Sequence, residues 1–327
     1  MQFLRDPDID PTPLANKRIA IMGYGNQGRA QALNLRDGGH DVVIGLREGS
    51  PSAAKVVADG LDHHPLADAA TGADLVMLLA PDEILSALYD AIEAAIRPGA
   101  ALGFSHGLAI RFGLIAPRAD LDVIMVAPKG PGTALRSLFV EGKGMVALWA
   151  VAHDATGHAA ALAKAYGAAI GCGRAGLIAS SFAEECEANL FNEQAVVWGA
   201  VPAILEGGFQ TLVEGGISPE VAFLECVGEL KLLAQLVEAR GLAGMREAIS
   251  NTAELGAVLG GPKIVDNRVR ERMRAILAEI RAGDFTSQLE RDAAGGYLLL
   301  NEARSLARTA PIEQVRLTLA KQLADDS

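Results

Sequence analysis

A glycine-rich turn near the start of the chain constrains the fold more than any other feature. An apolar run over residues 17–22, typical of a buried parallel strand, leads into Gly23-Tyr24-Gly25-Asn26-Gln27-Gly28, and a helix is expected over 29–37. In this order Gly23 permits a tight turn, Gly25 lets a pyrophosphate approach the backbone, and Gly28 allows close packing of helix on strand. The turn therefore predicts a dinucleotide-binding Rossmann domain.

More strands are predicted after this turn, and polar residues follow several of them. Apolar runs predict strands at 41–45, 74–80, 100–104, 121–126, 145–151 and 167–172. Ligands of open α/β sheets bind outside the carboxyl ends of the strands. His106 and Lys129 each follow a strand, so we expect both beside the nicotinamide end of the cofactor. The pair His63 and His64 is expected to lie in a solvated loop.

The end of the second strand indicates which cofactor is bound. NAD enzymes usually place an acidic residue there for the ribose hydroxyls. Here Arg47 comes first, followed by Glu48, Ser50 and Ser52. Arg47 can pair with a 2′-phosphate and the serine hydroxyls can donate to it, which favours NADPH. In the alternative interpretation Glu48 binds the ribose and Arg47 is a surface cation.

The pattern changes after about Ser181. Strand-like runs end there, and helical patterns continue to the end of the chain, most clearly over 220–240, 266–282 and 313–323. We predict an α/β fold with an NADP-binding Rossmann domain at 1–181 and an all-α domain at 182–327. The apolar faces of the helical half predict a homodimer or a higher homo-oligomer.

Two pairs of polar residues lie four positions apart in the helical half. Asn189 and Glu193 form one pair on a single expected helix, and Glu225 and Glu229 form the other. Oxygen ligands on two helices suit a hard cation such as Mg²⁺. The alternative interpretation is that both pairs lie on the solvated faces of amphipathic helices.

Composition excludes several classes of partner. The net charge is −11, and no basic stripe indicates nucleic acid. The three cysteines lack metal or disulfide spacing and are expected to be reduced. We see no apolar signal region and no apolar run approaching the roughly 18 residues of a membrane span. We therefore expect a cytoplasmic protein without a membrane partner.

A series of short motifs runs through the chain in one order: IMGYGNQG at 21–28, GLREGS at 45–50, APDE at 80–83, SHG at 105–107, APKGPG at 127–132, LFNEQ at 190–194, ELKL at 229–232 and SNTAE at 250–254. Over nearly its whole length the chain resembles the short-form (class I) ketol-acid reductoisomerases. The resemblance implies an NADPH-binding Rossmann domain and an all-helical, knotted C-terminal domain that dimerises. It also implies conversion of 2-acetolactate, or its ethyl homologue, to a 2,3-dihydroxy acid by Mg²⁺-assisted alkyl migration and hydride transfer.

The resemblance assigns roles by position. It implies that NADPH is contacted by Tyr24, Gly25, Asn26, Gln27, Arg47, Ser50, Ser52, Asp82 and Gly132. Lys129 would lie by the reacting oxygens, and His106 would be the active-site histidine. Metal would be held by Glu193, Glu225 and Glu229, of which Glu229 also counts as catalytic. Ser250 would bind the substrate carboxylate, from the partner subunit.

The chain departs from the family pattern in its acidic motif. The family motif reads D-L-F-G-E-Q and its aspartate bridges two Mg²⁺ ions, whereas this chain has Asn189 there and Asn192 in place of the glycine. An uncharged amide is a poor bridge between dications, so we expect fewer than two Mg²⁺ ions. Leu108, Arg111, Thr133 and Gly228 also differ from the family pattern.

Three functional hypotheses follow from this departure. The preferred one is an NADPH-dependent reductase of a small oxo or imino acid, with impaired or absent alkyl migration, since hydride transfer demands less of the metal site. The alternative is a working ketol-acid reductoisomerase of branched-chain amino-acid biosynthesis, which acts on a ketol acid. The third, an NADP-binding scaffold without activity, is disfavoured by the intact cofactor turn together with His106 and Lys129.

Overall fold

The computed structural model describes residues 3–325, which form two compact units. The N-terminal unit ends at Ala188 and the C-terminal unit begins at Asn189, so the division falls inside helix α8 (Phe182–Ala195). The domain boundary predicted between residues 181 and 182 lies just before this helix and stays a prediction.

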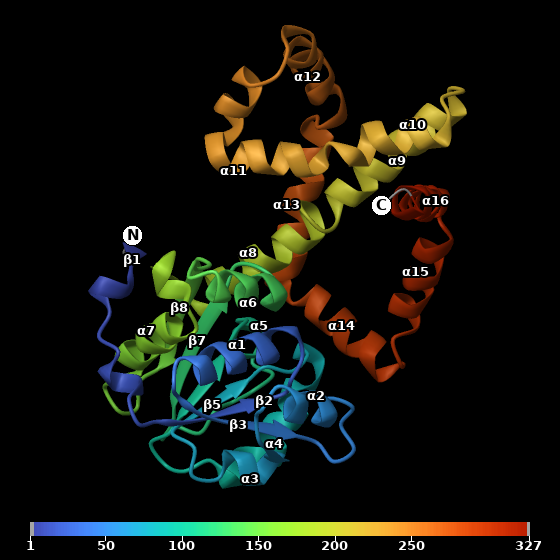
Figure 1. The fold of residues 1–327 in the computed structure, drawn as a ribbon. Coiled ribbons are helices and arrows are strands. Elements are labelled where there is room, and N and C mark those ends of the chain that lie inside the picture. The colour runs from blue at the N-terminus through green and yellow to red at the C-terminus, as the bar shows by residue number, and fades with distance from the viewer. Residues whose placement is uncertain (1–2, 326–327) are drawn as a thin grey trace. The chain divides into compact units, whose positions relative to one another are not determined.

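A mixed nine-stranded sheet forms the centre of the N-terminal unit (Figure 1). The strand order is β1-β9-β8-β7-β6-β5-β2-β3-β4. Strands β4, β3, β2, β5, β6 and β7 run parallel to one another. Strand β8 runs antiparallel to β7 and parallel to β9, and β1 runs antiparallel to β9. The strands are β1 (Phe3–Leu4), β2 (Arg18–Met22), β3 (Asp41–Leu46), β4 (His63–Pro65), β5 (Leu75–Leu78), β6 (Ala101–Phe104), β7 (Asp122–Pro128), β8 (Ala147–His153) and β9 (Leu177–Ala179).

Helices cover both faces of this sheet, because its strands are apolar on both sides. Along β2, Ile19 and Ile21 face one apolar cluster while Ala20 and Met22 face the other, as strand alternation requires. The first cluster includes residues of α1, α2, α6 and α7, and the second includes residues of α3, α4 and α5 and the start of α8. The helices are α1 (Asn26–Asp37), α2 (Ala53–Ala58), α3 (Leu66–Ala70), α4 (Leu85–Ile92), α5 (Leu108–Arg111), α6 (Gly132–Val140) and α7 (Ala159–Ala169).

The parallel strands bring the predicted site residues to one edge of the sheet. The glycine turn follows β2, Arg47 follows β3, Asp82 begins a short 3-10 helix after β5, His106 follows β6, and Lys129 follows β7. These strands are parallel, so their carboxyl ends share an edge. The doubly wound fold predicted from the sequence is confirmed.

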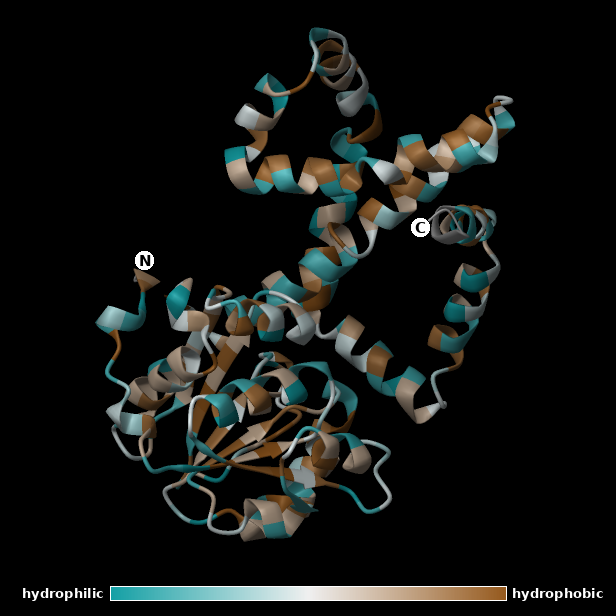
Figure 2. Cartoon of the chain, in the orientation of Figure 1, coloured by the Kyte–Doolittle hydropathy of each residue, from teal (hydrophilic) through white to brown (hydrophobic). Residues whose placement is uncertain are grey.

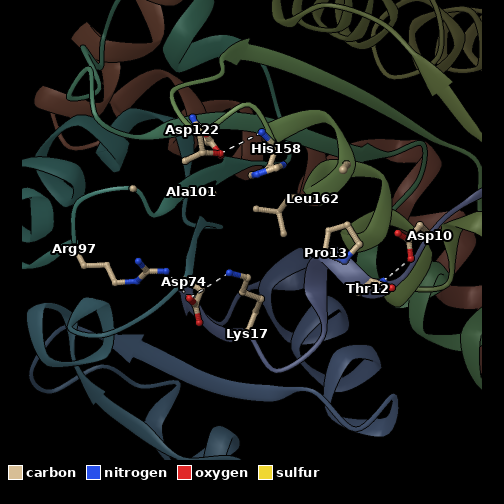
Figure 3. Close-up of a pocket in the computed structure, with 13 residues that line it drawn as sticks. Asp10, Thr12, Pro13, Lys17, Asp74, Arg97, Ala101, Asp122, His158 and Leu162 are labelled. Atoms are coloured by element: carbon tan, nitrogen blue, oxygen red, sulfur yellow. Dashed lines mark hydrogen bonds and ion pairs between the residues drawn. The ribbon is translucent and has the colours of Figure 1, made fainter.

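A cavity of about 380 Å³ lies at the opposite, amino-terminal edge of the sheet (Figure 3). The carboxylates that line it already have partners within the protein. Asp74 accepts from the Arg18 backbone at 2.8 Å and lies 3.6 Å from Lys17 Nζ, and Asp122 accepts from the Thr156 backbone at 2.9 Å. None of the sequence-predicted site residues lines this cavity.

Two local predictions in this unit were wrong. Residues 167–172 were predicted as a strand but form the end of α7 and the start of a 3-10 helix (Cys172–Arg174). This short run of small apolar residues suits a buried helix as well as a strand, and periodicity cannot separate the two. His63 and His64 are exposed but lie in the edge strand β4 rather than in a loop.

The C-terminal unit is helical throughout the part that the structure describes. After the second half of α8 its helices are α9 (Ala200–Glu214), α10 (Pro219–Phe223), the π-helix η6 (Leu224–Gly228), α11 (Leu230–Glu247), α12 (Asn251–Ile264), α13 (Asn267–Ala282), α14 (Asp284–Ala294), α15 (Leu298–Thr309) and α16 (Pro311–Asp325). The helix predicted over 266–282 is confirmed, with Asp266 as the N-cap of α13. The helix predicted over 220–240 is interrupted, because η6 separates α10 from α11. The knot implied by the family resemblance stays a prediction.

Large apolar side chains are exposed along the helices of this unit. Hydrophobic residues, coloured brown in Figure 2, recur along these helices. Trp198 is 67% exposed and Leu298 is 73% exposed. The stretch Phe182–Glu214, which joins α8 and α9, is long and apolar enough by length and composition to cross a membrane. Its longest run without a charged residue covers only 194–205, so no continuous apolar run of about 18 residues lies in this stretch. A single such stretch is weak evidence for a membrane span, and four glutamates lie in its first half.

Candidate functional site

Glycine is favoured at each of three positions in the turn after β2, and for a different local reason at each. Gly23 has a φ of +101°, a conformation that side-chain-bearing residues rarely adopt, and its amide donates to Gly45 at 3.1 Å. A Cβ on Gly28 would lie 2.5 Å from the Gly23 carbonyl oxygen. A Cβ on Gly25 would meet no atom within 4 Å. Gly25 therefore leaves open space at the N-terminus of α1, where a pyrophosphate can approach backbone N–H groups.

Tyr24 points into the protein rather than toward a ligand. Its ring is buried, and its hydroxyl donates to Asp59 Oδ2 at 2.9 Å. Arg29 makes a bidentate pair with the same carboxylate, at 2.6 and 2.7 Å. The Arg29 hydrogen bond is the main reason that the pKa of Asp59 falls to about 2. Asp59 thus joins the C-terminus of α2 to the glycine turn and to α1.

The loop between β3 and α2 carries the residues predicted to select NADPH. Arg47 is exposed at the end of β3, and the Ser52 backbone donates to Ser50 Oγ at 3.3 Å. Gly49 between them has a φ of +70°. The loop therefore presents a cation and two hydroxyl groups at the sheet edge where the ribose end of a dinucleotide lies in this fold.

His106 and Lys129 are brought together by a carboxylate to which the sequence reasoning gave no role. Glu185 of α8 is 1% exposed. Its Oε1 accepts from Lys129 Nζ at 2.6 Å, and its Oε2 lies 2.9 Å from His106 Nδ1 and accepts from the Gly107 amide at 2.8 Å. A Cβ on Gly107 would lie 2.1 Å from the Phe182 carbonyl oxygen, so glycine is required for α8 to come this close.

The charges of this cluster stabilise one another. Burial acts to raise the pKa of Glu185, but the hydrogen bond and charge of His106, together with Lys129, outweigh it and lower that pKa to about 2. Burial likewise acts to lower the pKa of His106, but hydrogen bonds to Cys186 and Glu185 and the charges of Glu185 and Asp82 raise it to about 10. Near neutral pH His106 is therefore an imidazolium and Glu185 a carboxylate.

This arrangement can stabilise negative charge that develops on a substrate oxygen. The Lys129 ammonium carries three hydrogens and donates one to Glu185, and its side chain is 33% exposed. A cation held in place by a buried carboxylate suits a developing oxyanion, because it needs no reorganisation during the reaction. One signal for Glu185 was present in the sequence. It lies four residues before Asn189, on the same face of α8.

Asn26, Gln27 and Gly132 tie the glycine turn to the loop that carries Lys129. Asn26 Oδ1 accepts from the Thr133 amide at 2.9 Å, and Gln27 Nε2 donates to the Gly130 carbonyl at 2.9 Å. A Cβ on Gly132 would lie 2.1 Å from the Asn26 carbonyl oxygen. The structure thus brings the predicted cofactor residues of β2 and β7 together. Their direct contacts with NADPH stay predictions.

The predicted metal ligands are not gathered in the same way. In the C-terminal unit Asn189 Nδ2 donates to Glu193 Oε1 at 2.8 Å, whereas Glu225 in η6 and Glu229 before α11 are both exposed. Among residues 3–325 no group of three or more His, Cys, Asp or Glu side chains could hold a metal ion. The oxygen donors suit Mg²⁺ chemically, but within one protomer they do not form its site.

Ser250 is the N-cap of α12. Its Oγ accepts from the Ala253 amide at 3.2 Å, and the residue is exposed. This capping bond is sufficient to explain a serine at the start of a helix. The predicted contact with the substrate carboxylate stays a prediction.

The fold and this site define a nicotinamide-dependent oxidoreductase. Residues 13–176 match the acetohydroxy acid isomeroreductase NADPH-binding domain, and residues 182–324 match the ketol-acid reductoisomerase C-terminal domain. A ketol-acid reductoisomerase (NADP(+)) of Kineococcus radiotolerans is 46% identical over 331 residues, which cover 100% of this chain and 97% of the relative. The chain therefore belongs to the ketol-acid reductoisomerase family, and the resemblance found in the sequence is confirmed.

Solved structures agree with this assignment. An NADH-preferring ketol-acid reductoisomerase from an uncultured archaeon superposes with a TM-score of 0.95 at 39% identity, over 98% of this chain and 99% of that one. A semialdehyde dehydrogenase NAD-binding protein of Cupriavidus necator has a TM-score of 0.59 at 19% identity, over 82% of this chain and 99% of that one. The second likeness shows the fold alone.

Proposed function

We propose that the chain is a working ketol-acid reductoisomerase, which converts 2-acetolactate or its ethyl homologue to the corresponding 2,3-dihydroxy acid. The observation that carries the proposal is the buried Glu185, which holds His106 and Lys129 side by side at the carboxyl edge of the sheet. The family matches over both parts of the chain support this activity. They support it better than the reductase without alkyl migration that was preferred from the sequence.

NADPH fits the residues at the edge of the sheet. The open space at Gly25 would receive the pyrophosphate, and Arg47, Ser50 and Ser52 would hold the 2′-phosphate. Bound there, the cofactor supplies the hydride. Lys129 and the His106 imidazolium place positive charge where the substrate oxygens gain negative charge, and Glu185 keeps both in position. Because one similar structure is NADH-preferring, the preference for NADPH depends on the 47–52 loop rather than on the fold.

A second copy of the chain is needed to gather the acidic side chains. Mg²⁺ prefers several oxygen ligands, whereas each described protomer offers Asn189 with Glu193 separately from Glu225 with Glu229. The exposed apolar side chains of the C-terminal unit, among them Trp198 and Leu298, supply a surface for dimerisation. We therefore propose a homodimer, or a multiple of one, as the active form. We also propose that it is cytoplasmic.

The proposal is tested by supplying two substrates separately. With NADPH and Mg²⁺, we expect turnover of 2-acetolactate and of the already rearranged 3-hydroxy-3-methyl-2-oxobutyrate, followed by absorbance at 340 nm. The product of both reactions should be 2,3-dihydroxyisovalerate by NMR. Turnover of the rearranged acid alone would restore the reductase hypothesis. Turnover of neither acid would overturn the proposed function.

A further inference from the structure

A buried glutamine in α1 joins the cofactor turn to both catalytic loops. Gln31 has no exposed surface. Its Nε2 donates to Ser105 Oγ at 2.9 Å and to Gln27 Oε1 at 3.1 Å, and its Oε1 accepts from the Tyr166 hydroxyl at 2.7 Å. Both amide hydrogens are therefore used, and so is the carbonyl oxygen.

Two of the three branches of this network, through Ser105 and through Gln27, end beside a catalytic residue. Ser105 immediately precedes His106. Gln27 Nε2 donates to the carbonyl of Gly130, which immediately follows Lys129. One amide thus connects the helix that starts at the cofactor turn with the loops of both charged groups.

Packing alone does not explain a glutamine at this position. Gln31 contacts Tyr166, and Leu35 lies one turn further along the same face of α1; both belong to an apolar cluster. A buried amide costs stability unless all its hydrogen bonds are made. An apolar side chain of similar volume at this position can leave the protein equally stable. What an apolar side chain cannot do is fix the Ser105 and Gln27 side chains to one point.

We propose that Gln31 is a positioning residue that sets where His106 and Lys129 lie relative to the bound cofactor. It acts through Ser105 and Gln27 and touches neither substrate nor cofactor. The proposal rests on the proposed function, since it concerns the hydride-transfer geometry of that site. Small errors in such geometry are costly: a displacement of about 1 Å can lower the rate about 100-fold.

Replacing Gln31 by methionine tests the role of its hydrogen bonds. With the rearranged acid as substrate, so that only reduction is measured, Gln31→Met should lower kcat by about 10- to 100-fold. The KM for NADPH should change less than threefold. With 4-deuterated NADPH the kinetic isotope effect on kcat should rise. The reason is that hydride transfer from a mispositioned cofactor becomes slower relative to the other steps of turnover.

Asn34, one turn further along α1, provides the matched control. It is equally buried, and it donates to the Ile170 carbonyl at 3.0 Å and accepts from Arg136 at 2.9 Å, so it contacts neither catalytic loop. Asn34→Leu should lower the melting temperature as much as Gln31→Met while leaving kcat and the isotope effect unchanged. Equal kinetic effects in the two variants would overturn the inference, since both would then act through stability.

Ser105→Ala removes the Gln31–Ser105 bond from its other side. It should reproduce the loss of kcat, and combining it with Gln31→Met should cost less than the sum of the two changes. If Gln31→Met does not fold, Ser105→Ala with wild-type kcat would overturn the inference. Failure of the wild-type protein on both substrates would instead overturn the proposed function, so the two failures are distinguishable.

Discussion

Glu185 and Glu193 lie eight residues apart in α8, yet their surroundings differ completely. Glu185 belongs to the N-terminal unit, is buried, and accepts hydrogen bonds from Lys129, His106 and Gly107. Glu193 belongs to the C-terminal unit, is exposed, and accepts from Asn189. The cluster around Glu185 is thus complete within one chain. The exposed carboxylate of Glu193 is left for the proposed partner chain and cation to reach.

Removing the charge of Glu185 should have the largest effect. Glu185→Gln leaves the His106 and Lys129 charges without their shared partner, so stability should fall by roughly 3 to 5 kcal/mol, with activity lost. Urea unfolding and NADPH oxidation measure the two effects. Glu187→Gln is the control, because Glu187 pairs with Arg111 at a more exposed position and should cost about 1 kcal/mol or less. A stable, active Glu185→Gln variant would show that the cluster is dispensable.

The same cluster should make stability depend on pH in two windows. The folded-state pKa of His106 is raised from 6.5 to about 10, so its contribution is complete below pH 6.5 and is lost between pH 6.5 and 10. The folded-state pKa of Glu185 is lowered from 4.5 to about 2, so its contribution is complete above pH 4.5 and is lost between pH 4.5 and 2.

In the upper window each pH unit should remove up to about 1.4 kcal/mol of unfolding free energy. His106→Asn should abolish this slope in urea unfolding series. His153→Asn should keep it, because His153 is an exposed residue whose ring contacts a backbone carbonyl. An unchanged slope in His106→Asn would contradict the assignment of the charge to His106.

Replacing Asn189 by the family aspartate tests the surroundings of Glu193. Asn189→Asp adds a carboxylate beside Glu193, so Mg²⁺ affinity in titration calorimetry should rise about tenfold, or about 1.4 kcal/mol. Without Mg²⁺ the variant should be less stable, because two carboxylates then face each other where Asn189 had donated a hydrogen bond. Asn192→Asp adds the same charge next to Glu193 in the sequence, where the two side chains of a helix do not face each other. Equal gains in both variants would mean that position 189 has no special role.

The smallest effect is expected at the cofactor turn. Tyr24→Phe removes one of the hydrogen bonds that tie α2 to this turn, but Arg29 still holds Asp59. The KM for NADPH should rise a few-fold, corresponding to about 1 kcal/mol, with kcat unchanged. Tyr89→Phe removes a hydroxyl that accepts from the Arg118 amide in the other apolar cluster, and it should leave this KM unchanged. A lower kcat in Tyr24→Phe would place Tyr24 closer to the chemistry than its contacts indicate.

The local parts of the fold could be predicted because their causes are local. The glycine turn needs three glycines at fixed spacing, and α13 begins at the capping Asp266. The 167–172 segment was mistaken for a strand because a short apolar run has no period of its own. The π-helix at Leu224–Gly228 was missed because helical periodicity does not reveal an extra residue within a turn.

The sequence by itself determined the family, the Rossmann turn and the order of the polar residues that follow the strands. These follow from spacing within a few residues and from motifs in a fixed order. Only the tertiary structure decided which side chains meet. Glu185 lies 79 residues from His106 and 56 from Lys129, and Gln31 lies 74 residues from Ser105. Contacts over such separations depend on how the sheet and helices pack, and no local pattern in the chain specifies them.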